Sequence, residues 1–113
     1  MATSAATRHA GTTVSLVRYA ADRRPLAAVA LTTDTSILTA AGNDLGFEQV
    51  FARQVEALCT ARDLLVLHST SGESGNLLAA ARRARELSVP TVAFLGKGGG
   101  ALAGLVDEAL VVP

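Results

Sequence analysis

A cluster of hydroxyl side chains follows an apolar run near the middle of the chain, and residues of these types bind anions. The six residues 69–74, called here the serine turn, comprise three serines, a threonine, a glycine and a glutamate. The run 64–67 before them is continuously apolar, and the segment 75–87 after them has helical spacing. A turn between a strand and a helix directs backbone amides and the positive end of the helix dipole towards a ligand. The pattern indicates a phosphate site formed by Ser69, Thr70, Ser71 and Ser74.

The serine turn contains no lysine or arginine, which narrows the class of anion. Nucleotide triphosphates usually require the lysine of a G-x-x-x-x-G-K-[ST] loop, and that motif is absent. Hydroxyl and amide donors suit a modest dianion such as a sugar phosphate, each hydrogen bond to it contributing about 1.5–3 kcal/mol. Helix capping alone is the simpler alternative, but a cap needs one hydroxyl and the turn has four.

The elements that must position the serine turn alternate along the chain. Buried strands are predicted from apolar runs at 26–31, 64–67, 91–95 and 109–112. Helices are predicted at 3–20, 36–41, 46–58, 75–87 and 101–105. Uniformly apolar strands that alternate with helices are typical of an α/β fold with a parallel sheet and right-handed crossovers. The length of 113 residues fits a single domain spanning 1–113.

Composition argues against several classes of protein. Ten basic residues balance ten acidic ones, so no charge excess favours nucleic acid or an anionic membrane. No apolar run approaches the roughly 18 residues that span a bilayer. Cys59 is the single cysteine, so no internal disulfide forms and a reducing, cytoplasmic setting is expected. Residues 1–13 lack the apolar core of a signal peptide.

Several motifs resemble a known family in their order and spacing. The serine turn, with Asn76 after it, resembles the S-T-S-G-N-S motif of sugar isomerase (SIS) domains. Segments 31–36 and 42–55 resemble the phosphoheptose isomerase branch, and the glycine turn at 96–100 continues the match towards the end of the chain. The resemblance implies a three-layer, Rossmann-like fold, in which helices flank a five-stranded parallel sheet.

The resemblance also implies a ligand, an activity and an assembly. Family members bind a phosphorylated sugar between the subunits of a homo-oligomer, and a dimer or a tetramer is expected here. The best-known activity is the aldose–ketose isomerisation of sedoheptulose 7-phosphate. Phosphate contacts are implied for the four hydroxyls of the serine turn, and sugar contacts for Asn43, Asp44 and Ser4.

The chain departs from the family pattern at both ends. Ser4 fits the end of the family's G-N-G-G-S motif, so the first strand before it is expected to be missing. The chain also stops before the family's last helix, which carries a Gln and a His, one of which serves in proton transfer. Two functions other than that of an isomerase therefore stay open. One is a non-catalytic phosphosugar-sensing or partner-docking module, and the other is a fragment of a longer enzyme.

Metal binding is not expected. Zinc occurs in some relatives, bound by a helical His and a Glu four residues later. Those positions fall on Ala10 and Val14, or on His9 and Thr13 after a shift of one residue, and neither alignment supplies the Glu. No cofactor is therefore predicted, and the catalytic residues stay unassigned.

Four side chains are possible bases for isomerisation, namely His9, His68, Asp44 and Glu73. A structural role is expected for His68 and a surface role for His9, whereas Asp44 is either a helix cap or a ligand contact. Glu73 stands where the family motif has Asn, so an acid beside the phosphate is expected to weaken binding or to select a different ligand. Cys59 is expected to be an ordinary thiol, and the arginines of 82–85 a solvated face. Lys97 is expected to be a mobile surface residue, with a phosphate contact as the alternative.

Overall fold

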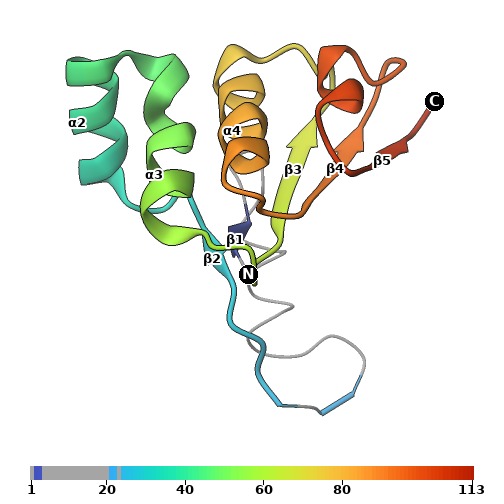
Figure 1. Cartoon of the computed structure of the whole chain (residues 1–113), viewed down its shortest axis with the longest axis horizontal. Coiled ribbons are helices and arrows are strands. Elements are labelled where there is room, and N and C mark those ends of the chain that lie inside the picture. The colour runs from blue at the N-terminus through green and yellow to red at the C-terminus, as the bar shows by residue number, and fades with distance from the viewer. Residues whose placement is uncertain (1, 4–20, 23) are drawn as a thin grey trace.

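The computed structural model describes residues 2–3, 21–22 and 24–113, which form a parallel sheet with helices packed against it (Figure 1). The strands are Ala2–Thr3 (β1), Val29–Ala30 (β2), Leu65–Ser69 (β3), Thr91–Leu95 (β4) and Glu108–Val111 (β5). Their order in the sheet is β2-β1-β3-β4-β5, and every pair is parallel. The predicted α/β fold with a parallel sheet is therefore confirmed, and β4 has the predicted bounds.

The prediction that the first strand is missing is corrected by β1. This strand has two residues and lies inside the sheet, where Ala2 pairs with Val29 on one side and Leu65 on the other. The interior position follows from the strand order, in which β2 and β5 are the edges. Sequence analysis missed β1 because a two-residue segment has no periodicity to detect.

The described helices are Thr35–Leu45 (α2), Val50–Leu58 (α3) and Gly75–Glu86 (α4), with 3₁₀ turns at Phe47–Gln49 (η1) and Ala101–Gly104 (η2). None of the helices in the described residues is long and apolar enough to cross a membrane. Asp34 caps α2 by accepting a hydrogen bond of 3.1 Å from the Ile37 amide. The predicted helix 3–20 lies outside the described residues.

The predicted end of the second helix at residue 41 was wrong. Helix α2 continues through Gly42 and stops before Gly46, whose φ of 90° is incompatible with a helix. A glycine inside a helix costs only about 1 kcal/mol, which packing against η1 offsets. The predicted helix 46–58 is correspondingly divided, because η1 forms a separate 3₁₀ turn before α3.

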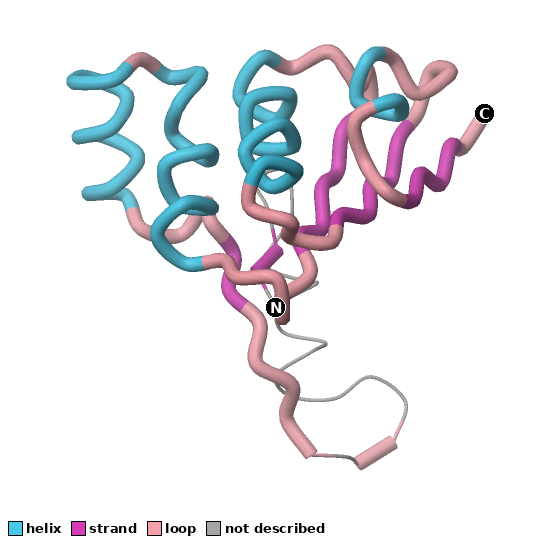
Figure 2. The backbone as a smooth tube through the Cα atoms, in the orientation of Figure 1, coloured by secondary structure: helices cyan, strands magenta, loops and turns pink. Residues whose placement is uncertain are grey.

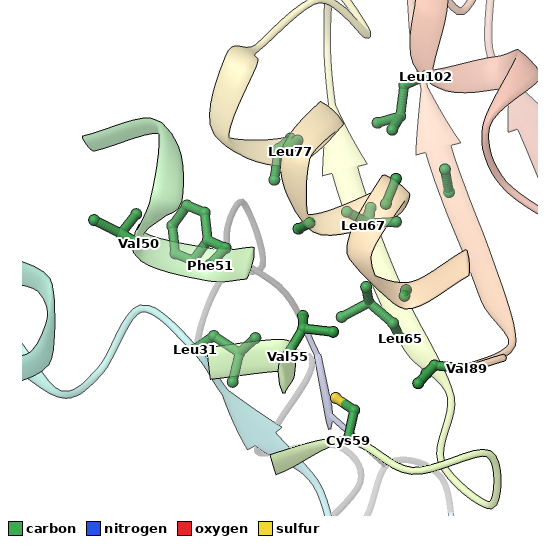
Figure 3. Packing of buried hydrophobic residues seen from close by; sticks show 14 of the residues in the cluster. Leu31, Val50, Phe51, Val55, Cys59, Leu65, Leu67, Leu77, Val89 and Leu102 are labelled. Atoms are coloured by element: carbon green, nitrogen blue, oxygen red, sulfur yellow. The ribbon is translucent and has the colours of Figure 1, made fainter. Parts of the chain in front are cut away.

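Helices α3 and α4 cover one face of the sheet in the described part of the chain. Leu65 and Leu67 of β3 are fully buried, and they belong to one core cluster with side chains of α3 and α4 (Figure 3). The alternate residues of the strands are more accessible, and Phe94 of β4 is 41% exposed. The side chains of α3 and α4 therefore hold β3 in position, and with it the start of the serine turn at the end of this strand.

Gln54 ties helix α3 to the end of β2. Its side chain is 5% exposed, and Nε2 donates hydrogen bonds to the carbonyl oxygens of Leu31 (2.9 Å) and Val50 (3.1 Å). Leu31 follows β2 directly and is itself 1% exposed. Because a buried carbonyl needs a donor, this amide fixes the chain at the point where it leaves the sheet for α2.

Replacement of Gln54 by methionine tests this tie. Gln54→Met keeps the side-chain length but leaves the Leu31 carbonyl without its side-chain donor, so we expect the free energy of unfolding to fall by about 1–3 kcal/mol. Urea unfolding followed by circular dichroism measures the loss. The exposed Gln49 supplies the control, since Gln49→Met should change stability by less than about 0.5 kcal/mol. Equal losses in the two variants would contradict the assigned role.

Candidate functional site

The serine turn begins at the carboxyl end of β3 and is folded by its own hydroxyl groups. The Gly72 amide donates to Ser69 Oγ at 2.9 Å, and the Glu73 amide donates to Ser71 Oγ at 3.2 Å. Each hydroxyl acts as an acceptor in these bonds, so its own proton is available for a ligand. Ser69 is half-buried, whereas Thr70, Ser71 and Ser74 are exposed.

Ser74 is the N-cap residue of α4, yet its hydroxyl makes no capping hydrogen bond to the described residues. Its carbonyl accepts from the amides of Leu77 (3.1 Å) and Leu78 (3.0 Å), which starts the helix. The side chain is therefore not needed for the cap. Helix capping alone does not account for the serine turn.

The glycine turn, residues 96–100, packs closely against the serine turn (Figure 2). The Gly96 amide donates to the Ser69 carbonyl at 3.2 Å, and the Leu102 amide donates to the Gly72 carbonyl at 3.0 Å. A Cβ atom built on Gly72 would lie 1.9 Å from the Gly99 carbonyl oxygen. The φ of Gly72 is +68°, so both the contact and the conformation require glycine.

Glu73 points towards the glycine-turn side of the site. Its Oε1 accepts a hydrogen bond of 2.8 Å from the Ala101 amide, the first of η2. A Cβ atom on Gly100 would lie 2.7 Å from the same oxygen. One carboxylate oxygen of Glu73 is thus engaged by η2, and the expected effect of this acid on a neighbouring phosphate stays a prediction.

Glu48 is a site-lining residue that sequence analysis missed. It lies on η1, and a Cβ atom on Gly75 would be 2.7 Å from its Oε1, so the carboxylate lies against the first residue of α4. The first turn of α4 has no acidic residue of its own. A carboxylate near a helix N-terminus interacts favourably with the dipole. No sequence spacing indicates this contact, since the two positions are 27 apart in the chain.

Asn43 and Asp44 lie in the last turn of α2, where Asn43 Nδ2 donates to Asp44 Oδ1 at 2.8 Å. Both are exposed. The C-terminal end of α2 and the N-terminal end of α4 lie at the same end of the helical layer, at the top of Figure 1. The third predicted sugar contact, Ser4, lies outside the described residues, as does His9.

The remaining sequence candidates lie away from the serine turn or have structural contacts. His68 stacks on Phe94 with ring centroids 5.0 Å apart. Cys59 is buried, and its burial, with a smaller effect from the charge of Asp63, raises the pKa of the thiol. Lys97 is exposed and has a φ of 46°. Among the described residues, no three His, Cys, Asp or Glu side chains form a group that would hold a metal ion.

The predicted solvated arginine face is correct for two residues and wrong for one. Arg82 and Arg85 are exposed. Arg83 is half-buried and forms ion pairs with Glu56 of α3 (3.0 Å) and with Glu86 (2.6 Å). It therefore links α4 to α3 and supports the layer that carries the serine turn.

Comparison with known proteins matches the model of the SIS domain family to residues 3–96, which include the serine turn. The chain belongs to the SIS domain family. The resemblance stated from the sequence motifs is thus confirmed at the level of the family.

Relatives of this SIS domain include phosphoheptose isomerases. That of Aquifex aeolicus is 50% identical over 96 residues, which are 85% of this chain and 50% of that protein. Phosphoheptose isomerase 1 of Campylobacter jejuni is 54% identical over 96 residues, which are 85% of this chain and 52% of that protein. The chain spans about half the length of the curated relatives it matches.

Solved structures give the same family. A phosphoheptose isomerase from Francisella tularensis superposes with a TM-score of 0.91 at 36% identity, covering 99% of this chain and 63% of that one. The corresponding enzyme from Neisseria gonorrhoeae gives a TM-score of 0.86 at 39% identity, with 99% of this chain and 62% of that one covered. The parallel sheet and its flanking helices therefore match those of SIS proteins.

Alanine substitutions at two glycines test whether the close contact between the serine turn and the glycine turn stabilises the fold. Gly72→Ala adds a clash with the Gly99 carbonyl to an unfavourable positive φ, so we expect unfolding free energy to fall by about 3 kcal/mol or more. Gly98→Ala is the matched control, because Gly98 has a φ of +81° but no described heavy atom within 4 Å of its Cβ position. Its cost should be about 1–2 kcal/mol. Thermal and urea unfolding measure the loss of unfolding free energy in both variants. Equal losses in Gly72→Ala and Gly98→Ala would refute the contact.

Proposed function

We propose that this SIS domain binds the phosphoryl group of a phosphorylated sugar at the serine turn. The observation that carries the proposal is Ser74, which occupies the N-cap of α4 while its hydroxyl stays unused for capping. The exposed hydroxyls of Thr70 and Ser71 precede it in the same turn. A phosphoryl group at this point gains charge-assisted hydrogen bonds and the favourable end of the α4 dipole.

The sugar we propose is sedoheptulose 7-phosphate, because the relatives are phosphoheptose isomerases. Asn43, Asp44 and Ser4 would contact the sugar, with the phosphate bound by Ser69, Thr70, Ser71 and Ser74. Aldose–ketose isomerisation also requires a base that moves a proton between adjacent carbons. Where the family has its helical Glu, this sequence has Thr13 or Val14, depending on the alignment. The missing Glu favours a second candidate function, that of a non-catalytic module that senses a phosphorylated sugar.

We further propose that the protein acts as a homo-oligomer, a dimer or a tetramer, in the cytoplasm. Exposed apolar side chains support association: Phe47 is 65% exposed and Leu45 47%, and both adjoin the same glycine at the end of α2. Exposed apolar groups of this size favour contact with another protein surface. The single cysteine, which is buried, suits a reducing compartment.

Binding of sedoheptulose 7-phosphate is the direct test. A ligand that binds only the folded state must raise the unfolding midpoint, so we expect a concentration-dependent rise by differential scanning fluorimetry. Ser71→Ala and Ser74→Ala should each weaken binding about tenfold or more, since each removes a hydrogen bond to a charged group. Thr39→Ala is the control, because the exposed Thr39 hydroxyl donates within α2 to the Thr35 carbonyl oxygen at 2.7 Å. An unchanged midpoint at millimolar ligand would exclude the proposal, and unphosphorylated sedoheptulose should have no effect.

Neutralisation of Glu48 should strengthen binding. Its carboxylate lies at the first residue of α4, so it repels a phosphoryl group that approaches the same helix end. We expect Glu48→Gln to lower the dissociation constant of sedoheptulose 7-phosphate about two- to fivefold, measured by isothermal titration calorimetry. Glu108→Gln makes the same charge change at the start of β5 and should leave the constant unaltered. Weaker binding by Glu48→Gln would show that the carboxylate instead contacts the ligand favourably.

A further inference from the structure

Glu73 joins two segments that both lie at the carboxyl edge of the sheet. It belongs to the serine turn, between β3 and α4, whereas its hydrogen-bond donor Ala101 begins η2 after β4. The two residues are 28 positions apart in the chain, and the bond between Oε1 and the amide is 2.8 Å long. We call this bond the latch.

The latch adds a side-chain bond to contacts that are otherwise made by backbone. The Leu102 amide donates to the Gly72 carbonyl at 3.0 Å, and Leu102 is fully buried, so η2 has a fixed position under the turn. A Cβ atom on Gly100 would lie 2.4 Å from the Ser71 carbonyl, which shows how closely the two backbones approach. Glu73 spans this contact and fixes the turn at the residue just before Ser74.

The latch also determines where a negative charge resides. Glu73 directly precedes Ser74, so an unrestrained carboxylate at this position could approach an anion bound at the start of α4. A carboxylate that accepts a bond from a backbone amide is held by a charge-assisted interaction. Its energetic preference for the Ala101 amide therefore keeps the charge on the η2 side of the turn.

We propose that Glu73 is a positioning residue, whose carboxylate binds the Ala101 amide and so fixes the hydroxyls of the serine turn for a phosphoryl ligand. The inference rests on the proposed function for its ligand, but the latch itself is independent of any ligand. Glu73 therefore assists binding at a position where its charge alone would oppose it. The hydrogen-bonding oxygen matters for this role, and the charge does not.

Two substitutions separate the oxygen from the charge. Glu73→Gln keeps an acceptor oxygen at the same reach, so sedoheptulose 7-phosphate should bind within about twofold of the unsubstituted protein. Glu73→Ala removes the acceptor, and its binding should weaken about five- to tenfold, less than the loss of a hydrogen bond made directly to the charged ligand. Calorimetry gives the dissociation constants. Glu108→Gln and Glu108→Ala at the opposite edge of the sheet are the matched controls and should bind normally.

Hydrogen exchange of the Ala101 amide, followed by nuclear magnetic resonance, tests the latch without ligand. Exchange should accelerate in Glu73→Ala and stay slow in Glu73→Gln. Unchanged exchange in Glu73→Ala would overturn the latch. Tighter binding by both variants would show that Glu73 acts by repulsion, and a lower midpoint with unaltered binding in Glu73→Ala would show a purely structural role. Failure of the unsubstituted protein to bind the sugar phosphate would instead refute the proposed function, and with it the effect of the latch on binding.

Discussion

The close approach of two backbone turns is the constraint on which the site depends. Gly72 and the glycine turn leave no space for a side chain between them, and the Leu102 amide bonds directly to the Gly72 carbonyl. The contact forms because β3 and β4 are parallel neighbours whose carboxyl ends meet at one edge. Two glycines with positive φ, Gly72 and Gly100, make the approach possible. The serine turn is therefore shaped by η2 as much as by its own residues.

Binding of a phosphoryl group and isomerisation of a sugar require different side chains. The hydroxyl and amide groups that suit a phosphoryl ligand lie together in residues 69–76. This segment includes the N-terminus of α4, where the positive end of the helix dipole lies. Isomerisation also needs a base placed against the sugar carbons, and among the described residues His68 is stacked on Phe94, outside the serine turn. Two carboxylates lie close to the hydroxyls of the turn: Glu48 lies against the first residue of α4, and Glu73 is bonded to the Ala101 amide. Phosphate affinity is thus the property that the local geometry supports most directly.

Sequence alone determined the fold class and the position of the serine turn. Strand 91–95 and the helix after the turn were predictable because an apolar run, a cluster of turn residues and a helical period follow one another without ambiguity. The family was also predictable, since the motifs around residues 31–55 and 69–76 keep their order and spacing. These features are local, so a short window of sequence contains all the information they need.

The tertiary structure decided what depends on residues distant in the chain. The partner of Glu73 is 28 residues away, and the Glu48 carboxylate reaches α4 from η1, so no spacing rule indicates either contact. Helix α2 runs past Gly42, because a glycine inside a helix has a small intrinsic cost, and it ends before Gly46, whose φ is 90°. Strand β1 pairs on both sides through two residues, and such a short strand exists only because its neighbours supply the hydrogen bonds.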